Sequence, residues 1–175
     1  VTGAIGQSTS LKTLTLANSN GATFSAPVTT GTEVMLSNTT AGQTIRFAHD
    51  LSTAALTTTG NAYHLALVGD NTHVSGATTF LNTGSLTLGN AASDNLAFDG
   101  GLVAAAPSVL SMGGTVATTN TAMTLGDNNT ALVLNNNLTL NTGNGGLTLD
   151  GAVSGAHNLN LNSAGLTSIV RALDV

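Results

Sequence analysis

The sequence runs Leu138-Thr139-Leu140-Asn141-Thr142-Gly143-Asn144-Gly145-Gly146-Leu147-Thr148-Leu149-Asp150-Gly151 near its C-terminal third. Two Leu-Thr-Leu triplets begin nine residues apart, and polar turn residues follow each of them at once. A period of two places both leucines of a triplet on one face of a β-strand and the threonine on the other. Asn, Gly and Asp then change the direction of the chain. The segment therefore predicts short strands with one apolar face, separated by tight corners.

The same apolar-x-apolar pattern recurs along the whole chain. Helix formers are scarce, with one Glu, one Lys and two Gln, and Thr, Asn and Gly interrupt every helical window. Turn residues such as Gly69-Asp70-Asn71 follow the triplets. The pattern predicts an all-β chain. Its other strand cores are Leu14–Leu16, Val34–Leu36, Ile45–Phe47, Leu65–Leu67, Leu86–Leu88, Leu96–Phe98, Met123–Leu125, Leu132–Leu134 and Leu159–Leu161.

The spacing of the triplets favours a β-solenoid. The steps from Leu138 to Leu159 and from Leu14 to Val34 are nearly equal in length. A step of about 20 residues, divided into two or three short strands, is what one coil of a solenoid requires. Residues 1–175 then form a single parallel β-helix module of about nine coils, which we expect to be a fragment of a longer repetitive chain. A β-sandwich is the alternative, because hairpin dipeptides such as Asn20-Gly21 also occur.

The solenoid predicts which side chains point inward. Stacked asparagines can bond one another through their amides, and the candidates for such a ladder are Asn135, Asn136, Asn137 and Asn141. The predicted inward set shares period-two pairing and coil spacing. It consists of Leu86, Leu88, Leu96, Phe98, Leu138, Leu140, Leu147, Leu149, Leu159 and Leu161.

Charge and composition exclude several classes of function. Charged residues make up 6 % of the chain, and the formal net charge is −5. Lys12, Arg46 and Arg171 are too few to neutralise the phosphates of a nucleic acid, and an acidic chain is not attracted to anionic lipid. Cysteine is absent, so neither disulfides nor thiolate metal sites hold the fold. No apolar run approaches the roughly 18 residues of a membrane span. We expect no nucleic-acid partner and no membrane insertion.

The four histidines do not form a metal-binding pattern. His49, His64, His73 and His157 contain no His-x-His or His-x-x-x-His pair. His49 and His73 are separated by little more than one predicted coil, so the solenoid could bring them to a shared face. Because no second carboxylate cluster accompanies them, we expect surface histidines and no metal site.

Two corners rich in oxygen donors raise the question of calcium: Gly69-Asp70-Asn71 and Gly126-Asp127-Asn128-Asn129. The repeat of calcium-binding β-rolls begins Gly-Gly-x-Gly-x-Asp, whereas residues 145–150 have Thr148 in place of the third glycine. Hard cations also need several carboxylates together, and the seven aspartates are scattered. We therefore expect turn hydrogen bonding at these corners, with no metal and no cofactor.

Catalysis on a β-helix needs clustered carboxylates with a nearby base. Only Asp94 and Asp99 are close in sequence, and they flank a strand without a basic or aromatic neighbour. Sugar sites favour aromatic platforms, but Tyr63 is the single Tyr and Trp is absent. The nucleophile motif Gly-x-Ser-x-Gly is also missing. We therefore expect that the chain is not an enzyme and has no catalytic residue.

Four blocks follow one another between Val74 and Ser168: Gly84–Asn90, Asn95–Leu102, Gly114–Asp127 and Gly146–Leu159. This order resembles the repeat units of filamentous-haemagglutinin-like adhesins and autotransporter passengers, which are very large bacterial surface proteins. The resemblance implies a right-handed parallel β-helix that is secreted across an outer membrane and displayed as a fibre. Residues 1–70 follow the same pattern of strand cores and turns less closely, since Arg46 and His49 depart from it. The signal domain of two-partner secretion is not recognisable, which implies a stretch of shaft.

These observations predict a non-catalytic structural shaft of a bacterial surface adhesin or extracellular fibre, located outside the cell or at the outer membrane. Both ends of the chain, residues 11–16 and 166–175, read as strands without a charged or Pro-rich block. We therefore expect end-to-end contacts with neighbouring repeats or with copies of itself. A host surface or glycan would be bound through a tip outside this chain.

The alternative function is an ice-binding or carbohydrate-binding β-solenoid. Ice binding needs a flat Thr-x-Thr array repeated at every coil of one face, and Thr13-Leu14-Thr15 begins such a pattern. The outward middle positions of the strand cores then show no regular array. They are Met35, Arg46, Ala66, Thr87, Ala97, Thr124, Val133, Thr139, Thr148 and Asn160.

Overall fold

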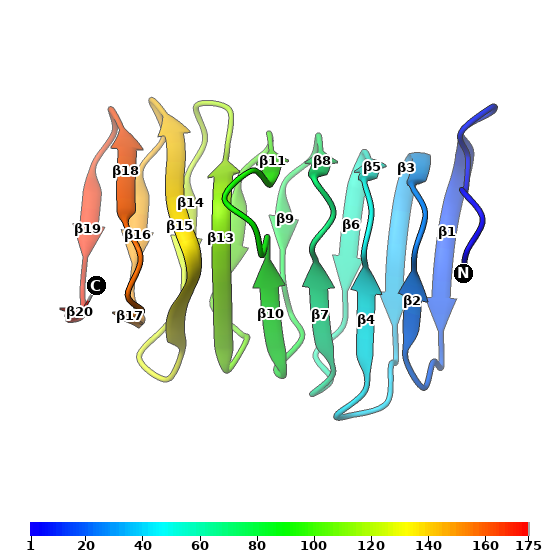
Figure 1. Ribbon diagram of the computed structural model, residues 1–175, viewed down its shortest axis with the longest axis horizontal. Helices are drawn as coiled ribbons and strands as arrows, with labels where there is room; N and C mark the ends of the chain where they lie inside the picture. Colours follow the sequence, from blue (N-terminus) through cyan, green and yellow to red (C-terminus); the bar gives the residue numbers. More distant parts are fainter. Residues whose placement is uncertain (175) are drawn as a thin grey trace.

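The computed structural model describes residues 1–174, which fold into a parallel β-helix (Figure 1). Twenty strands and no helix are present in this described part of the chain. The strands are β1 (Leu11–Ala17), β2 (Ala22–Phe24), β3 (Val28–Ser37), β4 (Thr44–Phe47), β5 (Leu51–Thr53), β6 (Ala55–Thr58), β7 (His64–Leu67), β8 (Asn71–Val74), β9 (Thr78–Thr79), β10 (Ser85–Leu88), β11 (Asn95–Phe98), β12 (Leu102–Ala104), β13 (Val109–Ala117), β14 (Met123–Leu125), β15 (Ala131–Gly143), β16 (Leu147–Leu149), β17 (Ala152–Ser154), β18 (Leu159–Ser163), β19 (Thr167–Ile169) and β20 (Leu173–Asp174).

Three faces run along the helix, and every strand pairing within them is parallel. Face 1 contains β2, β4, β7, β10, residues 109–112, residues 131–134, β17 and β20. Face 2 contains residues 28–30, β5, β8, β11, residues 115–117, residues 138–141 and β18. Face 3 contains β1, residues 33–37, β6, β9, β12, β14, β16 and β19. A β-sandwich would be built from antiparallel ladders, so the solenoid interpretation is confirmed.

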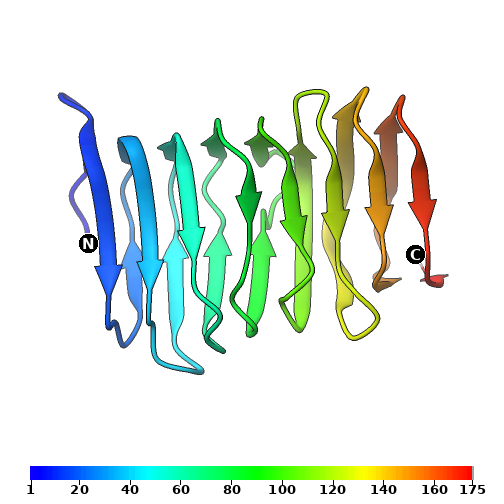
Figure 2. The same cartoon turned by 180° about the vertical axis from the view of Figure 1, so that it is seen from behind.

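The helix is right-handed. In Figure 1 the nearer strands, such as β4 and β7, run upward, while the farther strands, such as β6 and β9, run downward. The chain meanwhile advances from the N-terminus at the right towards β19 at the left, and Figure 2 shows the same course from behind. Right-twisted strands joined by parallel crossovers favour this hand.

The described chain makes eight coils, close to the nine expected. One column of ladder partners on face 1 crosses all eight levels, and the coils are slightly longer on average than the sequence predicts. Their length also varies, since the step from Leu86 to Leu110 is longer than the step from Ile45 to Leu65. The column is Ala22, Ile45, Leu65, Leu86, Leu110, Leu132, Val153 and Leu173.

The apolar interior is continuous from Phe24 to Val153. Eight of the ten leucine and phenylalanine side chains predicted to point inward are buried, between 0 and 2 % exposed, and that prediction is confirmed for them. Leu159 and Leu161 pack against the core but are only partly buried, because their coil is the last one described on face 2. Aromatic rings also pack in this interior, as in the stacked pair Phe24–Phe47, whose ring centroids are 4.7 Å apart.

The asparagine ladder lies at a different corner from the predicted one. Asn135 donates to Ser111 Oγ and to the Gly89 carbonyl, and Asn137 Oδ1 accepts from the Asn158 backbone. None of these contacts joins one asparagine side chain to another. The residues of the insertion 135–137 lie where the ladder between β13 and β15 shifts register, so their side chains lack an identical residue in the coil before. Asparagine side chains stack instead at Asn18, Asn38 and Asn61.

Candidate functional site

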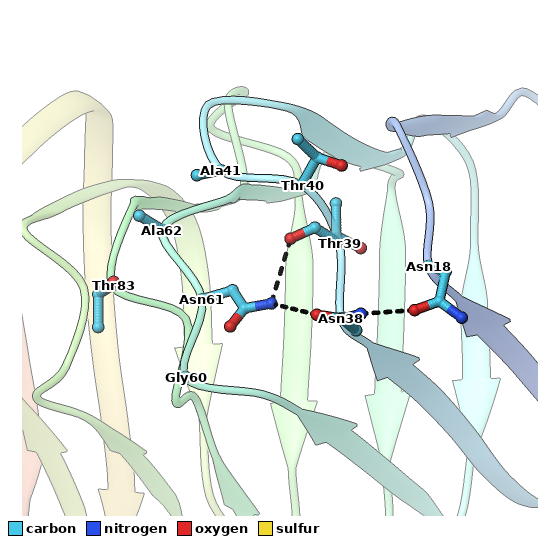
Figure 3. A pocket seen from close by; sticks show the side chains of 9 residues that line it. All are labelled: Asn18, Asn38, Thr39, Thr40, Ala41, Gly60, Asn61, Ala62 and Thr83. Carbon is cyan, nitrogen blue, oxygen red and sulfur yellow. Dashed lines mark hydrogen bonds between the residues drawn. The ribbon is translucent and has the colours of Figure 1, made fainter.

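A polar hollow lies at the corner where face 3 passes into face 1. The connections β1–β2, β3–β4, β6–β7 and β9–β10 form it, and its volume is about 540 Å³. Its lining contains amide, hydroxyl and small side chains, and none of the nine residues is charged (Figure 3). They are Asn18, Asn38, Thr39, Thr40, Ala41, Gly60, Asn61, Ala62 and Thr83.

Three asparagine amides form a head-to-tail string along this hollow. Asn61 Nδ2 donates to Asn38 Oδ1 at 3.0 Å, and Asn38 Nδ2 donates to Asn18 Oδ1 (Figure 3). Asn18 and Asn38 both have left-handed backbone, with φ of 50° and 58°. Asparagine adopts this region more readily than other residues with a side chain, which suits it to a corner.

The string leaves one polar atom free at each end. Within residues 1–174 neither Asn61 Oδ1 nor Asn18 Nδ2 has a hydrogen-bond partner. Thr40 Oγ1 donates to Asn20 Oδ1 at 2.7 Å and so holds the neighbouring loop in place. The string therefore has one unused acceptor at its Asn61 end and one unused donor at its Asn18 end.

The histidines lie apart and have different partners. His73 Nε2 is 2.8 Å from Asp99 Oδ2, and Thr119 Oγ1 donates to Asp99 Oδ1 at 2.7 Å. These two contacts, with Thr119 the larger, lower the pKa of Asp99 below its ordinary value. His64 Nδ1 accepts from the Ser85 backbone at 3.0 Å and contacts Ser85 Oγ.

His49 and His73 do not share a face, although the coil spacing allowed it. The ladder partners of His73 are Ser52 and Ala97, while His49 precedes β5 and contacts the adjacent Asp50. Ser52, His73 and Asp99 stand on successive coils, yet no hydrogen bond joins Ser52 to His73 in the described chain. Within residues 1–174 no three His, Asp or Glu side chains come together as a metal-binding group.

The carboxylates close turns. Buried Asp94 accepts through Oδ2 from the backbone N–H groups of Asn90 and Ala91, at 2.8 and 3.0 Å. Asp127 Oδ1 accepts from the Asn129 backbone and from Thr130 Oγ1, and these hydrogen bonds lower the pKa of Asp127. Asp94 and Asp99 therefore have different partners: Asp94 accepts from backbone N–H groups of its own turn, whereas Asp99 contacts His73 in the preceding coil. The turn hydrogen bonding expected at residues 126–129 is present.

Face 3 carries a nearly regular rank of hydroxyl groups. The middle positions of the strand cores belong to all three faces, so their order along the sequence does not reveal this rank. Ladder register gives six hydroxyl side chains in eight levels, flanked by small residues such as Ala122 and Gly146. The rank consists of Thr15, Met35, Thr57, Thr79, Val103, Thr124, Thr148 and Ser168. Between β6 and β9 the register follows from the Thr58 hydroxyl, which accepts from the Leu81 backbone and donates to the Thr79 carbonyl.

The first and last coils of the described chain expose apolar side chains. Ile169 is 42 % exposed, whereas its ladder partner Leu149 in the preceding coil is 1 % exposed, and Leu11 in the first coil is 40 % exposed. Within residues 1–174, β1 pairs with β3 alone and β19 with β16 alone. Each of these strands has one edge whose backbone donors and acceptors are available for another strand.

No family model matches the chain, and no curated protein or solved structure matches it either. No helix of residues 1–174 has the length and hydropathy needed to cross a membrane. The fold and its surface define the chain as a right-handed parallel β-solenoid with polar, sparsely charged faces.

Proposed function

We propose that this β-solenoid is the structural shaft of a secreted bacterial surface adhesin or extracellular fibre. The column of ladder partners from Ala22 to Leu173, which crosses every described coil, supports this most directly. Continuous ladders make each coil a rigid step of about 4.8 Å, and the buried interior contributes about 25 cal/mol per Å² of area removed from water. Such a rod holds a distant binding region away from a cell, and the resemblance of its blocks to adhesin repeats points to the same role.

The shaft extends by adding strands in register at its two ends. The exposed edges of β1 and β19 and the exposed inward-facing Ile169 and Leu173 favour contact with a further coil. Neighbouring repeats of a longer chain, or copies of this chain, supply that coil. The resulting head-to-tail contact is heterologous and gives a filament.

Sedimentation velocity over a concentration series, with electron microscopy of the same samples, tests this proposal. We expect association that grows with concentration and filaments one solenoid wide. The substitution Ile169→Lys, at an inward-facing position left exposed in the last described coil, should weaken association at least tenfold. Ala152→Lys, on an exposed position of β17 along face 1, is the matched control and should leave it unchanged. A monomer up to about 1 mM, or equal loss with both variants, would contradict the end-to-end proposal.

The hydroxyl rank on face 3 favours ice binding as a second candidate. Its hydroxyl groups repeat at the coil spacing of about 4.8 Å, and the small residues Ala122 and Gly146 lie beside Thr124 and Thr148. Met35 and Val103 interrupt the rank. Thermal hysteresis measured on the wild type and on Thr124→Lys decides this candidate, because a bulky charge in the middle of an ice-binding face abolishes its fit. Absence of hysteresis in the wild type rejects it.

A further inference from the structure

We propose that the corner hollow lined by Asn18, Asn38, Asn61 and Thr83 binds a neutral saccharide. This inference goes beyond the proposed shaft, because it places a ligand site on the side of the rod and not at its end. The hollow has a volume of about 540 Å³, and the connections of four successive coils form it.

The lining selects against charged ligands. Asparagine, threonine, alanine and glycine supply all nine lining residues, so the hollow contains no ionised side chain to pair with a phosphate, a carboxylate or an amine. A ligand held there must exchange its water contacts for hydrogen bonds to neutral groups. Uncharged hydroxyl groups fit this requirement, since each donates one hydrogen bond and accepts others.

The three amides of the string are oriented in the same direction along the hollow. Asn61 donates to Asn38, and Asn38 donates to Asn18, so all three amides point the same way along the rod. Successive hydrogen bonds in such a chain polarise one another. The unpartnered Asn61 Oδ1 at one end accepts a ligand hydroxyl, and the unpartnered Asn18 Nδ2 at the other end donates to one. A molecule with hydroxyl groups spread over two coil spacings, about 10 Å, can use both ends. Two linked sugar rings are the smallest saccharide of that length.

Small side chains keep the hollow open. Ala41, Gly60 and Ala62 lie on the walls between the polar residues (Figure 3). A methyl group added at Gly60 would be 3.9 Å from its nearest neighbour, the Leu81 carbonyl oxygen, so this wall has room to spare. No aromatic ring lines the hollow, and stacking on a sugar ring is therefore absent from the described lining. We expect a dissociation constant on the order of 1 mM, typical of binding by a few hydrogen bonds.

NMR spectroscopy of the whole chain tests the inference, with cellobiose, lactose and chitobiose as neutral probes and inorganic phosphate and sialyllactose as charged ones. We expect saturable shifts of the side-chain amide resonances of Asn18, Asn38 and Asn61 with at least one neutral disaccharide. Phosphate should cause none. Sialyllactose should bind no better than lactose.

Three variants identify the site. Asn61→Ala removes the free acceptor, and Ala62→Leu fills the hollow while leaving every amide in place. Each should weaken binding at least tenfold, whereas Asn158→Ala, an exposed asparagine near the other end of the solenoid, should not change it. Circular dichroism and thermal melting check that each variant folds. The inference is overturned if no neutral disaccharide gives saturable shifts, if phosphate gives shifts of the same size, or if the shifts survive Ala62→Leu. End-to-end association of the rods is measured separately and does not depend on these outcomes.

Discussion

The side-chain amide of Asn38 donates to Oδ1 of Asn18 one coil earlier, and both residues have left-handed backbone, with φ of 58° and 50°. The corner therefore places two demands on each residue. The backbone must tolerate positive φ, and the side chain must bond its equivalent in the next coil. Asparagine meets both, whereas glycine meets the first alone and alanine meets neither.

Substitution of Asn38 separates these two demands. Asn38→Gly loses the amide string but accommodates the backbone, while Asn38→Ala loses the string and adds the cost of a Cβ in the left-handed region. We expect Asn38→Ala to have a free energy of unfolding about 1–2 kcal/mol below that of Asn38→Gly. Urea denaturation of both variants measures the difference. Equal stabilities would mean that the left-handed backbone adds no cost at this corner.

The interior could be predicted from the sequence because period-two alternation acts within each strand. Leu140 and Leu149 point inward whatever the length of the coil that contains them. Contacts between coils could not be predicted in the same way, because the sequence offset between consecutive ladder partners changes from coil to coil. His73 and Asp99 belong to neighbouring coils and lie in contact, a pairing that only the ladder between β8 and β11 reveals. The hydroxyl rank and the asparagine string were missed for the same reason.

A charge in the apolar interior should destabilise the solenoid strongly. Leu149 is 1 % exposed and packs in the core cluster, so Leu149→Asp buries a carboxylate without a partner. We expect a loss of about 3–5 kcal/mol in the free energy of unfolding, or failure to fold. Thr148→Asp, the adjacent outward position, is the matched control and should cost below about 0.5 kcal/mol, as surface substitutions usually do. Urea denaturation measures both, and similar losses for the pair would contradict the assignment of inward and outward faces.

Close approach of backbones should make Gly69 irreplaceable. A Cβ at Gly69 would overlap the carbonyl carbon and oxygen of His49 in the preceding coil, and backbone atoms cannot rotate away. Gly60 lies at another corner with free space around the position of a Cβ. We expect Gly69→Ala to lower the free energy of unfolding by about 1–3 kcal/mol, the usual cost of overpacking. Gly60→Ala should be neutral or stabilising by up to about 1 kcal/mol through lower entropy of the unfolded chain. Thermal melting ranks the two, and the reverse order would contradict the close contact between coils.

The stability of the solenoid should depend on pH through Asp99. Hydrogen bonds from Thr119, and then contact with His73, lower the pKa of Asp99 in the folded state. The unfolded chain therefore binds a proton to this carboxyl at a higher pH than the folded chain does. The resulting stabilisation is fully present above the ordinary aspartate pKa of about 3.9 and is lost as the pH falls through the lower folded value.

Thr119→Val removes the larger of the two contacts and should move the pKa of Asp99 back towards its ordinary value. The difference in free energy of unfolding between wild type and Thr119→Val should therefore be larger at about pH 6 than at about pH 2.5. Carbon-13 NMR titration of the Asp99 carboxyl group measures the pKa directly, and urea denaturation at both pH values measures the stability. Thr115→Val, an outward threonine on β13 paired with Asn95 and Thr139, is the control and should show the same difference at both pH values. An Asp99 titration that is unchanged by Thr119→Val would show that the hydroxyl does not hold the carboxylate in solution.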